Sequence, residues 1–397
     1  MIVSVAVVLA IAVLPFLGFR AYARRVEAMD ASLEDRLHRL RRAQQFGYIV
    51  VSVVAILAVV AVDVIGQVQG LLETAVPGLY TLPGVGWLVD LLLIFGVVAL
   101  PIVSAVLGAY PTERSLRETS ASSRAVVKGV LGGMAAMIVS IVFVVEGIGL
   151  ITSIAGSSTP VLIAALAVVI FAVFALAPYL TLLFSERVSL AGDRRERVEG
   201  LCADLGYTPR ALYLLEGEST KAANALVAGT LPGLRYVFLT DYLLEECSDA
   251  ELRAILAHEF GHVAGRHLWQ RAILTVAVFG AGIAAYGPLG VAALEAQFGF
   301  VGFFLPFIAL FLLYYVVFLG GLALWQERRA DAYAARTAGV GATVAGLETL
   351  ADANDTREDV GTVYSLLTHH PPIGDRIDAV RDGVDGREST RSARTTR

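Results

Sequence analysis

Cysteine, lysine and charge are all scarce in this chain of 397 residues. Its two cysteines, Cys202 and Cys247, are too few for a disulfide framework, and their spacing fits no zinc ribbon. The formal net charge of −5 argues against nucleic acid as a partner. Charged residues make up only 17% of the chain and hydrophobic residues 56%, which excludes an ordinary soluble globule and indicates a polytopic membrane protein. Lysine occurs only at positions 128 and 221, and this arginine bias in an acidic chain is typical of a salt-adapted prokaryote.

Seven long apolar stretches predict transmembrane helices, because a helix needs about 20 residues to cross a bilayer. They lie near residues 1–19, 46–66, 86–109, 128–151, 159–184, 269–292 and 299–324. The first stretch lacks a basic n-region and an A-x-A site, so we interpret it as an anchor and not as a signal peptide. The lipid bilayer is therefore an expected partner.

The loops between these stretches differ in positive charge. The first loop carries seven arginines, at positions 20, 24, 25, 36, 39, 41 and 42, and the third carries Arg114, Arg117, Arg124 and Lys128. The loops at 67–85, 146–158 and 293–298 carry no lysine or arginine. By the positive-inside rule, this predicts a plasma-membrane protein with its N-terminus outside and its C-terminus in the cytoplasm. Within the first loop, residues 20–45 predict a short amphipathic helix, which we interpret as a solvated cytoplasmic hairpin lying along anionic headgroups and not as a binding site for a partner.

The run HEFGH, from His258 to His262, carries the residue types of a hydrolytic metal site. Apolar residues at helical spacing precede it, and Asp249 stands where an N-cap belongs. On such a helix His258 and His262 lie one turn apart on one face and can hold a single zinc ion. Glu259 can reach a water on that metal, whose pKa falls to about 7, and take its proton as a general base.

The third ligand is expected on the same side of the membrane, after the seventh span. Glu327 and Asp331 lie there, one helical turn apart. Glu327 can complete a set of two histidines and one carboxylate, which suits one Zn²⁺ per chain best, and Asp331 can hold the outer N–H of a ligating histidine. His267 stands one residue short of the place where a metzincin has its third histidine, so we leave it out of the ligand set.

A second interpretation of Glu327 and Asp331 is a charged cap at the end of a membrane helix. Arg328 and Arg329 would then be ordinary interfacial anchors. The paired HEFGH motif and the matching topology favour the metal site.

The segment 185–268 turns from apolar to soluble in composition. It opens with a charged stretch, residues 186–206, which predicts a helix. Two short β-like runs follow at 211–216 and 234–244, and residues 223–229 between them predict an edge-like strand. An open sheet edge just before a zinc helix could bind an extended polypeptide substrate.

The order of the motifs carries a family resemblance. HEFGH, then Glu327 and Asp331, then His370-Pro371-Pro372 with Arg376, resembles the membrane gluzincin metallopeptidases, the family of HtpX-type proteases and CAAX prenyl proteases. The resemblance covers residues 190–381, and the seven-span layout is closer to the CAAX branch. Ala323 and Leu324 depart from it, because the family often has Ser-Arg there.

The resemblance implies roles for further residues. His258, His262 and Glu327 would bind zinc, with Glu259 as the general base and Asp331 supporting a ligand. Implied beside them are His370, which would stabilise the tetrahedral oxyanion, Arg376 near the site, and Asn224 and Ala225 at the edge that binds the substrate backbone.

The predicted fold is mainly α: a seven-span transmembrane helical bundle with a cytoplasmic α+β zincin-type metalloprotease domain. The expected parts are an N-terminal membrane region (1–184), two catalytic segments (185–268 and 325–382) separated by spans six and seven (269–324), and a disordered tail (383–397).

The predicted function is that of an integral-membrane zinc metalloendopeptidase. It would hydrolyse membrane-associated or unfolded proteins at the cytoplasmic face, in quality control. One alternative is a CAAX-type prenyl-protein endopeptidase, which we place second because a prokaryotic host would rarely offer prenylated substrates. An alternative of another class is a catalytically dead membrane scaffold or transporter. The sequence leaves the oligomeric state open.

Overall fold

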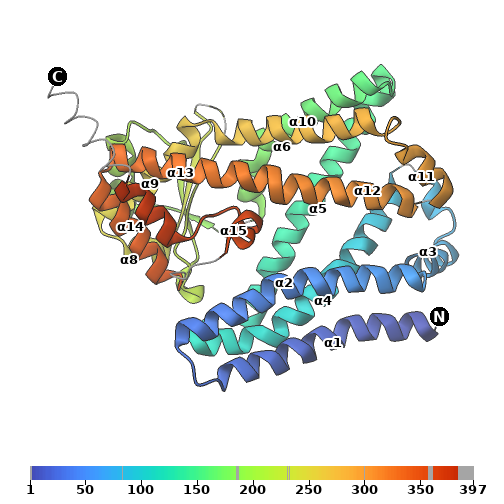
Figure 1. Cartoon of the computed structure of the whole chain (residues 1–397), viewed down its shortest axis with the longest axis horizontal. Helices are drawn as coiled ribbons and strands as arrows, with labels where there is room; N and C mark the ends of the chain where they lie inside the picture. Colours follow the sequence, from blue (N-terminus) through green and yellow to red (C-terminus); the bar gives the residue numbers. More distant parts are fainter. Residues whose placement is uncertain are drawn as a thin grey trace. The chain divides into compact units, whose positions relative to one another are not determined.

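Helices dominate the chain (Figure 1). In this computed structural model the described residues are 2–82, 84–184, 187–229, 231, 233–298, 300–355 and 361–382. The chain divides into two units, Met1–Val142 and Phe143–Arg397. The predicted tail, residues 383–397, lies outside the described residues.

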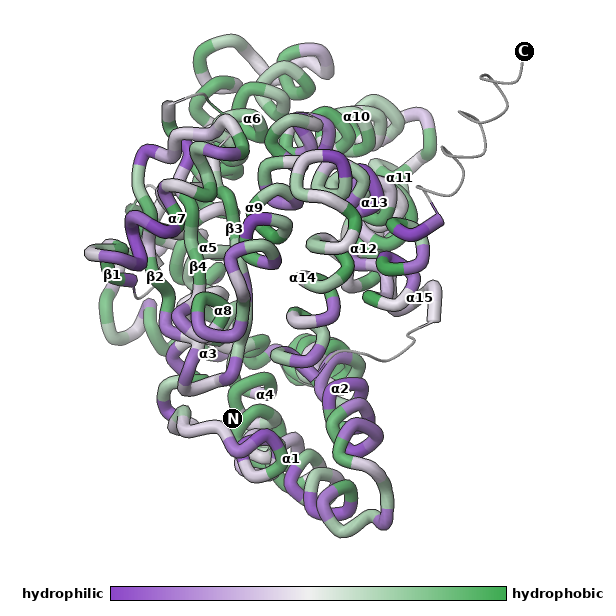
Figure 2. The backbone as a smooth tube through the Cα atoms, turned by 90° about the vertical axis from the view of Figure 1, so that its left-hand side faces the viewer, coloured by the Kyte–Doolittle hydropathy of each residue, from purple (hydrophilic) through white to green (hydrophobic). Residues whose placement is uncertain are grey.

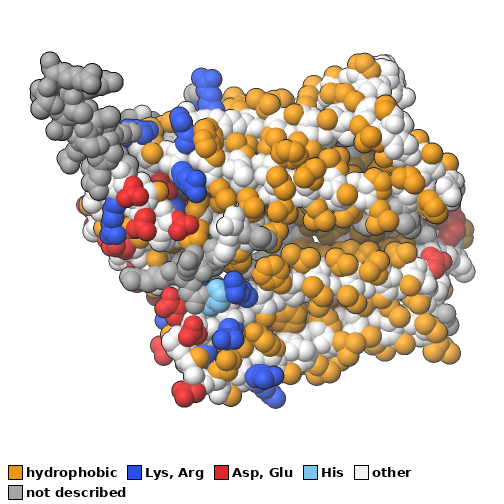
Figure 3. Space-filling model, viewed as in Figure 1, with side chains coloured by type: hydrophobic (Ala, Val, Ile, Leu, Met, Phe, Trp, Pro, Cys, Tyr) orange, Lys and Arg blue, Asp and Glu red, His pale blue; other side chains and the backbone are white. Residues whose placement is uncertain are grey.

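The prediction of seven spans is confirmed, because seven helices of the described chain are long and apolar enough to cross a membrane. They are α1 (Ile2–Glu27), α2 (Leu33–Ala61), α4 (Val85–Arg117), α5 (Ser123–Ala155), α6 (Thr159–Phe184), α10 (His267–Ala285) and the continuous helix of α12 (Phe300–Leu312), a π-helical segment (Leu313–Leu319) and α13 (Gly320–Thr337). Apolar side chains cover these helices along most of their length, and the visible lysines and arginines of each unit gather toward one end (Figure 3). The protein is a multi-pass membrane protein, and its fold is mainly helical as predicted.

The remaining helices are short. They are α3 (Val64–Ala75), α7 (Gly192–Asp204), α8 (Asp241–Glu246), α9 (Asp249–Ala264), α11 (Val291–Phe298), α14 (Val340–Ala353) and α15 (Thr362–Thr368), with 3₁₀ turns at Leu79–Thr81 and Glu218–Thr220 and a last helical stretch over residues 373–382.

In the first unit α1 and α4 pack closely. A side chain at Gly108 would bring its Cβ to 2.5 Å from the carbonyl oxygen of Phe16, so only glycine fits at this crossing. Ser104 of α4 forms hydrogen bonds with the backbone of α1 next to Pro15. Its hydroxyl accepts the N–H of Phe16 at 3.0 Å and donates to the carbonyl of Ala12. Ser104 thus satisfies two backbone groups beside Pro15, which interrupts the α1 hydrogen-bond ladder in an apolar span.

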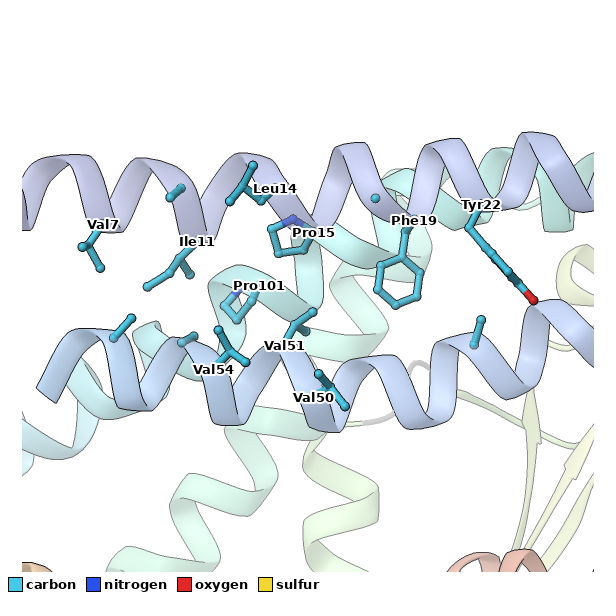
Figure 4. A pocket seen from close by; sticks show the side chains of 15 residues that line it. Val7, Ile11, Leu14, Pro15, Phe19, Tyr22, Val50, Val51, Val54 and Pro101 are labelled. Carbon is cyan, nitrogen blue, oxygen red and sulfur yellow. The ribbon is translucent and has the colours of Figure 1, made fainter. Parts of the chain in front are cut away.

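An apolar cavity of about 480 Å³ lies between α1 and α2 in this unit. Figure 4 shows Ile11, Leu14 and Pro15 of α1 and Val51 and Val54 of α2 along its walls.

The single amphipathic helix predicted over residues 20–45 is wrong, although the segment does form a hairpin. The segment is split, because α1 continues to Glu27, a turn follows, and α2 begins at Leu33, where Ser32 accepts the N–H of Asp35 at 3.0 Å. Leu37 and Leu40 are 1% and 0% exposed, so their apolar face packs inside the unit and does not lie along headgroups.

The second unit contains a four-stranded sheet. Its strands are β1 (Arg187–Ser189), β2 (Ala211–Leu215), β3 (Ala225–Ala228) and β4 (Tyr236–Thr240), in the order β1-β2-β4-β3. β2 and β4 are parallel, and the two outer pairs are antiparallel. β3 therefore forms an edge, as predicted. By contrast, the helix predicted over 186–206 begins only at Gly192, because residues 187–189 pair with β2 as β1.

β4 lies between β2 and β3, and both its faces are apolar and buried. Val237 and Leu239 face the main core with α7 and α9, while Tyr236 and Phe238 face a second cluster. Cys202 and Cys247 are free and buried, and burial raises the pKa of both thiols to about 12. They behave as small core residues.

The N-cap of α9 is Ser248, one residue before the predicted Asp249. Ser248 and Glu251 form a capping box, in which Glu251 Oε2 accepts the backbone N–H of Ser248 at 2.8 Å. β3 lies beside α9, and α13 is more hydrophilic than α12 along the tube (Figure 2). Gly261 of α9 faces Ala330 of α13: a Cβ at Gly261 would lie 3.0 Å from Ala330 Cα.

We expect Gly261→Val to force α9 and α13 apart, because the added side chain meets backbone that cannot rotate away. Overpacking of this kind costs about 1–3 kcal/mol. Thermal unfolding of the detergent-purified protein and its zinc content measure the two consequences, and both should fall. The control is Gly200→Ala in α7, where nothing lies within 4 Å of the added Cβ. An exposed helical glycine gains roughly 0.5–1 kcal/mol from that change. Unchanged zinc content in Gly261→Val would contradict the close-contact argument.

Candidate metal centre

His258 and His262 of α9 and Glu327 of α13 meet at one point. One candidate ligand atom from each lies within 4.8 Å of the others. The two histidine Nε2 atoms are 3.2 Å apart, and Glu327 Oε1 is 3.3 Å from Nε2 of His262. Two imidazole nitrogens and a carboxylate oxygen converge here as in a catalytic zinc site with two histidines and one glutamate.

The donor set fits a cation on a second observation. Glu327 is only 2% exposed, and its Oε2 is buried without a hydrogen-bond partner. A buried carboxylate oxygen without a well-formed hydrogen bond is costly unless an ion or water binds it, and Arg376 Nη1 is 3.7 Å away. Oε2 lies 3.6 Å from Nε2 of His258, so a zinc ion between them would satisfy both atoms.

Asp331 and Arg376 form the layer behind His258. Asp331 Oδ1 is 2.8 Å from Nδ1 of His258, the ring nitrogen turned away from the cluster. Arg376 holds Asp331 by two bonds, from Nε to Oδ2 at 2.9 Å and from Nη2 to Oδ1 at 2.7 Å. Such an outer carboxylate fixes the tautomer and ring orientation of a ligating histidine. Burial and Arg376 act to lower the pKa of His258, yet Asp331 and Glu327 outweigh them and raise it to about 9. The two carboxylates therefore favour a positive charge at this point, which a cation bound to the neutral imidazole would supply.

His267 supports the second histidine, a role that the sequence reading missed. It is not among the ligand atoms, as expected, but its Nδ1 lies 2.8 Å from Nδ1 of His262. The turn at Arg266, which adopts a left-handed conformation (φ 54°), brings the buried His267 back against α9. Gly265 leaves the room for it, because a Cβ there would lie 2.2 Å from His267 Nε2. The sequence offers one signal for this contact: His267 is a polar residue two positions after Gly265, which ends α9.

The structure separates the two adjacent histidines of the HPP motif. His370 Nδ1 lies 3.3 Å from Glu327 Oε2, and its side chain is 66% exposed. His369, with a left-handed backbone (φ 64°), instead places Nε2 3.2 Å from the carbonyl oxygen of Tyr315. Only His370 therefore faces the ligand cluster.

Glu259 and the predicted substrate edge lie together. Glu259 Oε2 accepts the backbone N–H of Val227 in β3 at 3.4 Å. Asn224 and Ala225 stand at the start of β3 and line two cavities, of about 140 and 780 Å³. Both cavities also touch His258, Glu259, Glu327 and His370. Both cavities therefore border the ligand cluster and the start of the edge strand.

Comparisons with known proteins agree with this geometry. Residues 188–384 match the sequence profile described as Peptidase family M48. Protease HtpX of Chromohalobacter salexigens is 29% identical over 189 residues, which cover 41% of this chain and 63% of that protein. Protease HtpX of Pseudomonas aeruginosa is 33% identical over 188 residues, 40% of this chain and 62% of that protein. The chain thus matches less than two thirds of the length of these relatives.

A solved structure extends the likeness in fold. The crystal structure of S. mikatae Ste24p superposes with a TM-score of 0.62 at 16% identity, covering 96% of this chain and 99% of that one. At this identity the likeness supports the fold alone, including the seven-helix layout.

Zinc content should separate Glu327 from Glu259. We expect Glu327→Gln to lose zinc, because a neutral amide is a poor ligand and leaves the cation without its charged partner. Glu259→Gln should retain about one zinc per chain, since Glu259 faces Val227 and is outside the ligand cluster. Metal analysis of both purified variants measures this. Equal zinc content in the two variants would remove Glu327 from the site.

Asp331→Asn should weaken zinc binding without removing a ligand. Loss of the carboxylate behind His258 typically lowers metal affinity about 10–100-fold. Competition with a chelator of known affinity measures the change, while thermal unfolding of the metal-free protein reports the separate cost of removing the Asp331–Arg376 ion pair. Wild-type zinc affinity in a folded Asp331→Asn protein would show that Asp331 serves packing only.

Proposed function

Because residues 188–384 belong to peptidase family M48, we propose that this multi-pass membrane protein is a zinc-dependent endopeptidase. The observation that carries the proposal is the meeting of His258, His262 and Glu327, with one ligand atom of each within 4.8 Å. The three residues come from α9 and α13, which are separated in the sequence by α10 and α12. Such a convergence has no evident structural purpose without a cation.

In the proposed mechanism His258, His262 and Glu327 hold the ion. A zinc ion bound there would polarise a peptide carbonyl and acidify water. Glu259 takes the proton from the attacking water and passes it to the leaving amine. His370 faces the cluster with an exposed ring and donates to the carbonyl oxygen as its negative charge develops.

The substrate is proposed to be a polypeptide in extended form. β3 is an edge strand, so backbone groups on its outer side can pair with an added strand, apart from the N–H of Val227, which Glu259 accepts. A folded domain cannot present its backbone in this way, which favours membrane-associated or unfolded proteins and hence quality control. The positive charge of the loops supports a metal centre at the cytoplasmic face of the plasma membrane.

A prenyl-protein endopeptidase remains the second candidate. The likeness to S. mikatae Ste24p extends over nearly the whole chain, including the N-terminal helices. Cleavage of a prenylated CAAX peptide in preference to the same peptide without its lipid would support this candidate, whereas equal cleavage of unlipidated, unfolded membrane proteins supports quality control.

We expect Glu259→Gln to lower peptide cleavage by about 10²–10⁴-fold, the usual contribution of a general base. The variant should still bind zinc, so the loss is one of chemistry. Wild-type protein stripped with a chelator should lose cleavage and regain it when zinc is added. Glu199→Gln, an exposed change on α7, is the matched control and should cleave normally. Full activity of Glu259→Gln would instead favour a scaffold or transporter with an inert metal site.

A further inference from the structure

The larger cavity beside the metal centre is unevenly charged. Three arginines line its volume of about 780 Å³: Arg235, Arg266 and Arg271. The only carboxylates among the described lining residues are Glu259 and Glu327, and both have roles in the proposed chemistry. Three cations therefore face a space in which no acidic side chain is free to balance them.

Arg271 is the most firmly held of the three. Its Nε donates to Gln326 Oε1 at 2.8 Å, and Gln326 is fully buried. The amide nitrogen of Gln326 donates in turn to Gln270 at 2.9 Å and to the carbonyl of His267 at 3.2 Å. This chain of bonds fixes the orientation of the planar guanidinium. Within the described chain, no carboxylate lies at ion-pair distance from it, and its two terminal amino groups have no bonded acceptor.

The other two arginines add to the imbalance. Arg266 lies in the turn between α9 and α10, is exposed, and has no ion pair with a described residue. Arg235 places its guanidinium 5.8 Å from the ring centre of Tyr207, and its Nε is buried without a hydrogen-bond partner. Leaving a charged donor unpaired in a partly dry site is costly, so an incoming anion would be favoured there.

The position of the cavity identifies the kind of anion. One wall is the edge strand itself, from Ala225 to Ala228, and the cavity reaches His258 and Glu259. A substrate paired with β3 advances about 3.3 Å per residue and turns alternate side chains to the same face. A side chain within a few residues of the scissile bond can thus enter the cavity.

We propose that this cavity is an acidic-residue subsite, which binds the carboxylate of an aspartate or glutamate side chain of the substrate, with Arg271 as the principal donor. The inference rests on the proposed endopeptidase function and names its substrate class: extended polypeptides with an acidic residue close to the cleaved bond. Arg266 and Arg235 raise the local positive potential. Arg271 supplies a two-pronged pair of N–H donors that matches a carboxylate.

The test uses the full-length zinc-loaded protein and one cleavable peptide in which a single glutamate is moved through the positions on either side of the scissile bond. Each peptide has a partner with glutamine at the same place. Wild-type kcat/KM should favour glutamate over glutamine by about 10–100-fold at one or two positions, the worth of a charge-assisted hydrogen bond. In Arg271→Gln this ratio should fall to near one.

Two further variants refine the result. Arg271→Lys keeps the charge but loses the planar fork, and should retain part of the preference. Arg329→Gln is the matched control, because Arg329 stacks on Trp325 outside the cavity, and it should keep the full preference.

Three outcomes overturn the proposal. The first is an equal loss of cleavage for both peptides in Arg271→Gln, which would mean that the residue only supports Gln326. The second is a preference that depends on a free rather than an amidated peptide C-terminus. The third is an effect seen only with phosphatidylglycerol vesicles, which would assign the cavity to a lipid headgroup.

The subsite can be tested apart from catalysis. Fluorescence anisotropy of the same peptides on the Glu259→Gln variant reads binding alone. A glutamate preference there that Arg271→Gln removes in the double variant supports the subsite even if no peptide is cleaved, and an absent preference refutes it. Failure of wild-type cleavage to depend on zinc would instead refute the proposed function.

Discussion

The close contact of α9 with α13 is the constraint on which the candidate site depends. Gly261 lets the backbone of α9 reach that of α13, with the Cβ position only 3.0 Å from Ala330 Cα. At that separation Glu327, one turn before Asp331, reaches both imidazoles of the HEFGH motif, and Asp331 reaches the back of His258. The chain between the two helices contains α10 and α12, so the soluble part of the site is assembled only when these spans are in place.

The buried charges of the metal centre favour a bound cation, in addition to the close packing of α9 against α13 that brings the ligands together. Glu327, Asp331 and Arg376 are all buried or nearly so, and two carboxylates face one guanidinium. Such a buried cluster is stable only when every charge has a partner, since desolvation otherwise exceeds the Coulombic gain. Glu327 Oε2 is the atom without a hydrogen bond. Metal binding and the stability of the second unit should therefore be linked.

Much of this organisation could be predicted from the sequence, and the rest could not for physical reasons. Apolar length alone predicts the seven spans, and short β-like runs predict β2, the edge strand β3 and β4. The run predicted over 234–244 is too long, because β4 ends at Thr240 and Asp241–Glu246 form α8. The amphipathic helix over 20–45 was misplaced because periodicity shows that Leu37 and Leu40 share a face without showing what covers it. His267 was given no role because a single left-handed residue, Arg266, redirects the chain. Arg271 gained its position through Gln326, 55 residues away, and no local pattern contains that contact.

The π-helical segment Leu313–Leu319 lies between the apolar helix α12, which faces lipid, and α13, which presents Glu327 to the metal centre. One continuous α-helix would have to meet both requirements in a single helical register. Each residue of an α-helix turns the chain by about 100°, so a wide turn with its extra residue resets the direction in which all later side chains point. The direction in which α12 turns its side chains toward lipid is thus set separately from the direction in which α13 presents Glu327. A shortening of the wide turn by one residue, by contrast, would swing the carboxylate out of line while leaving every motif in the sequence intact.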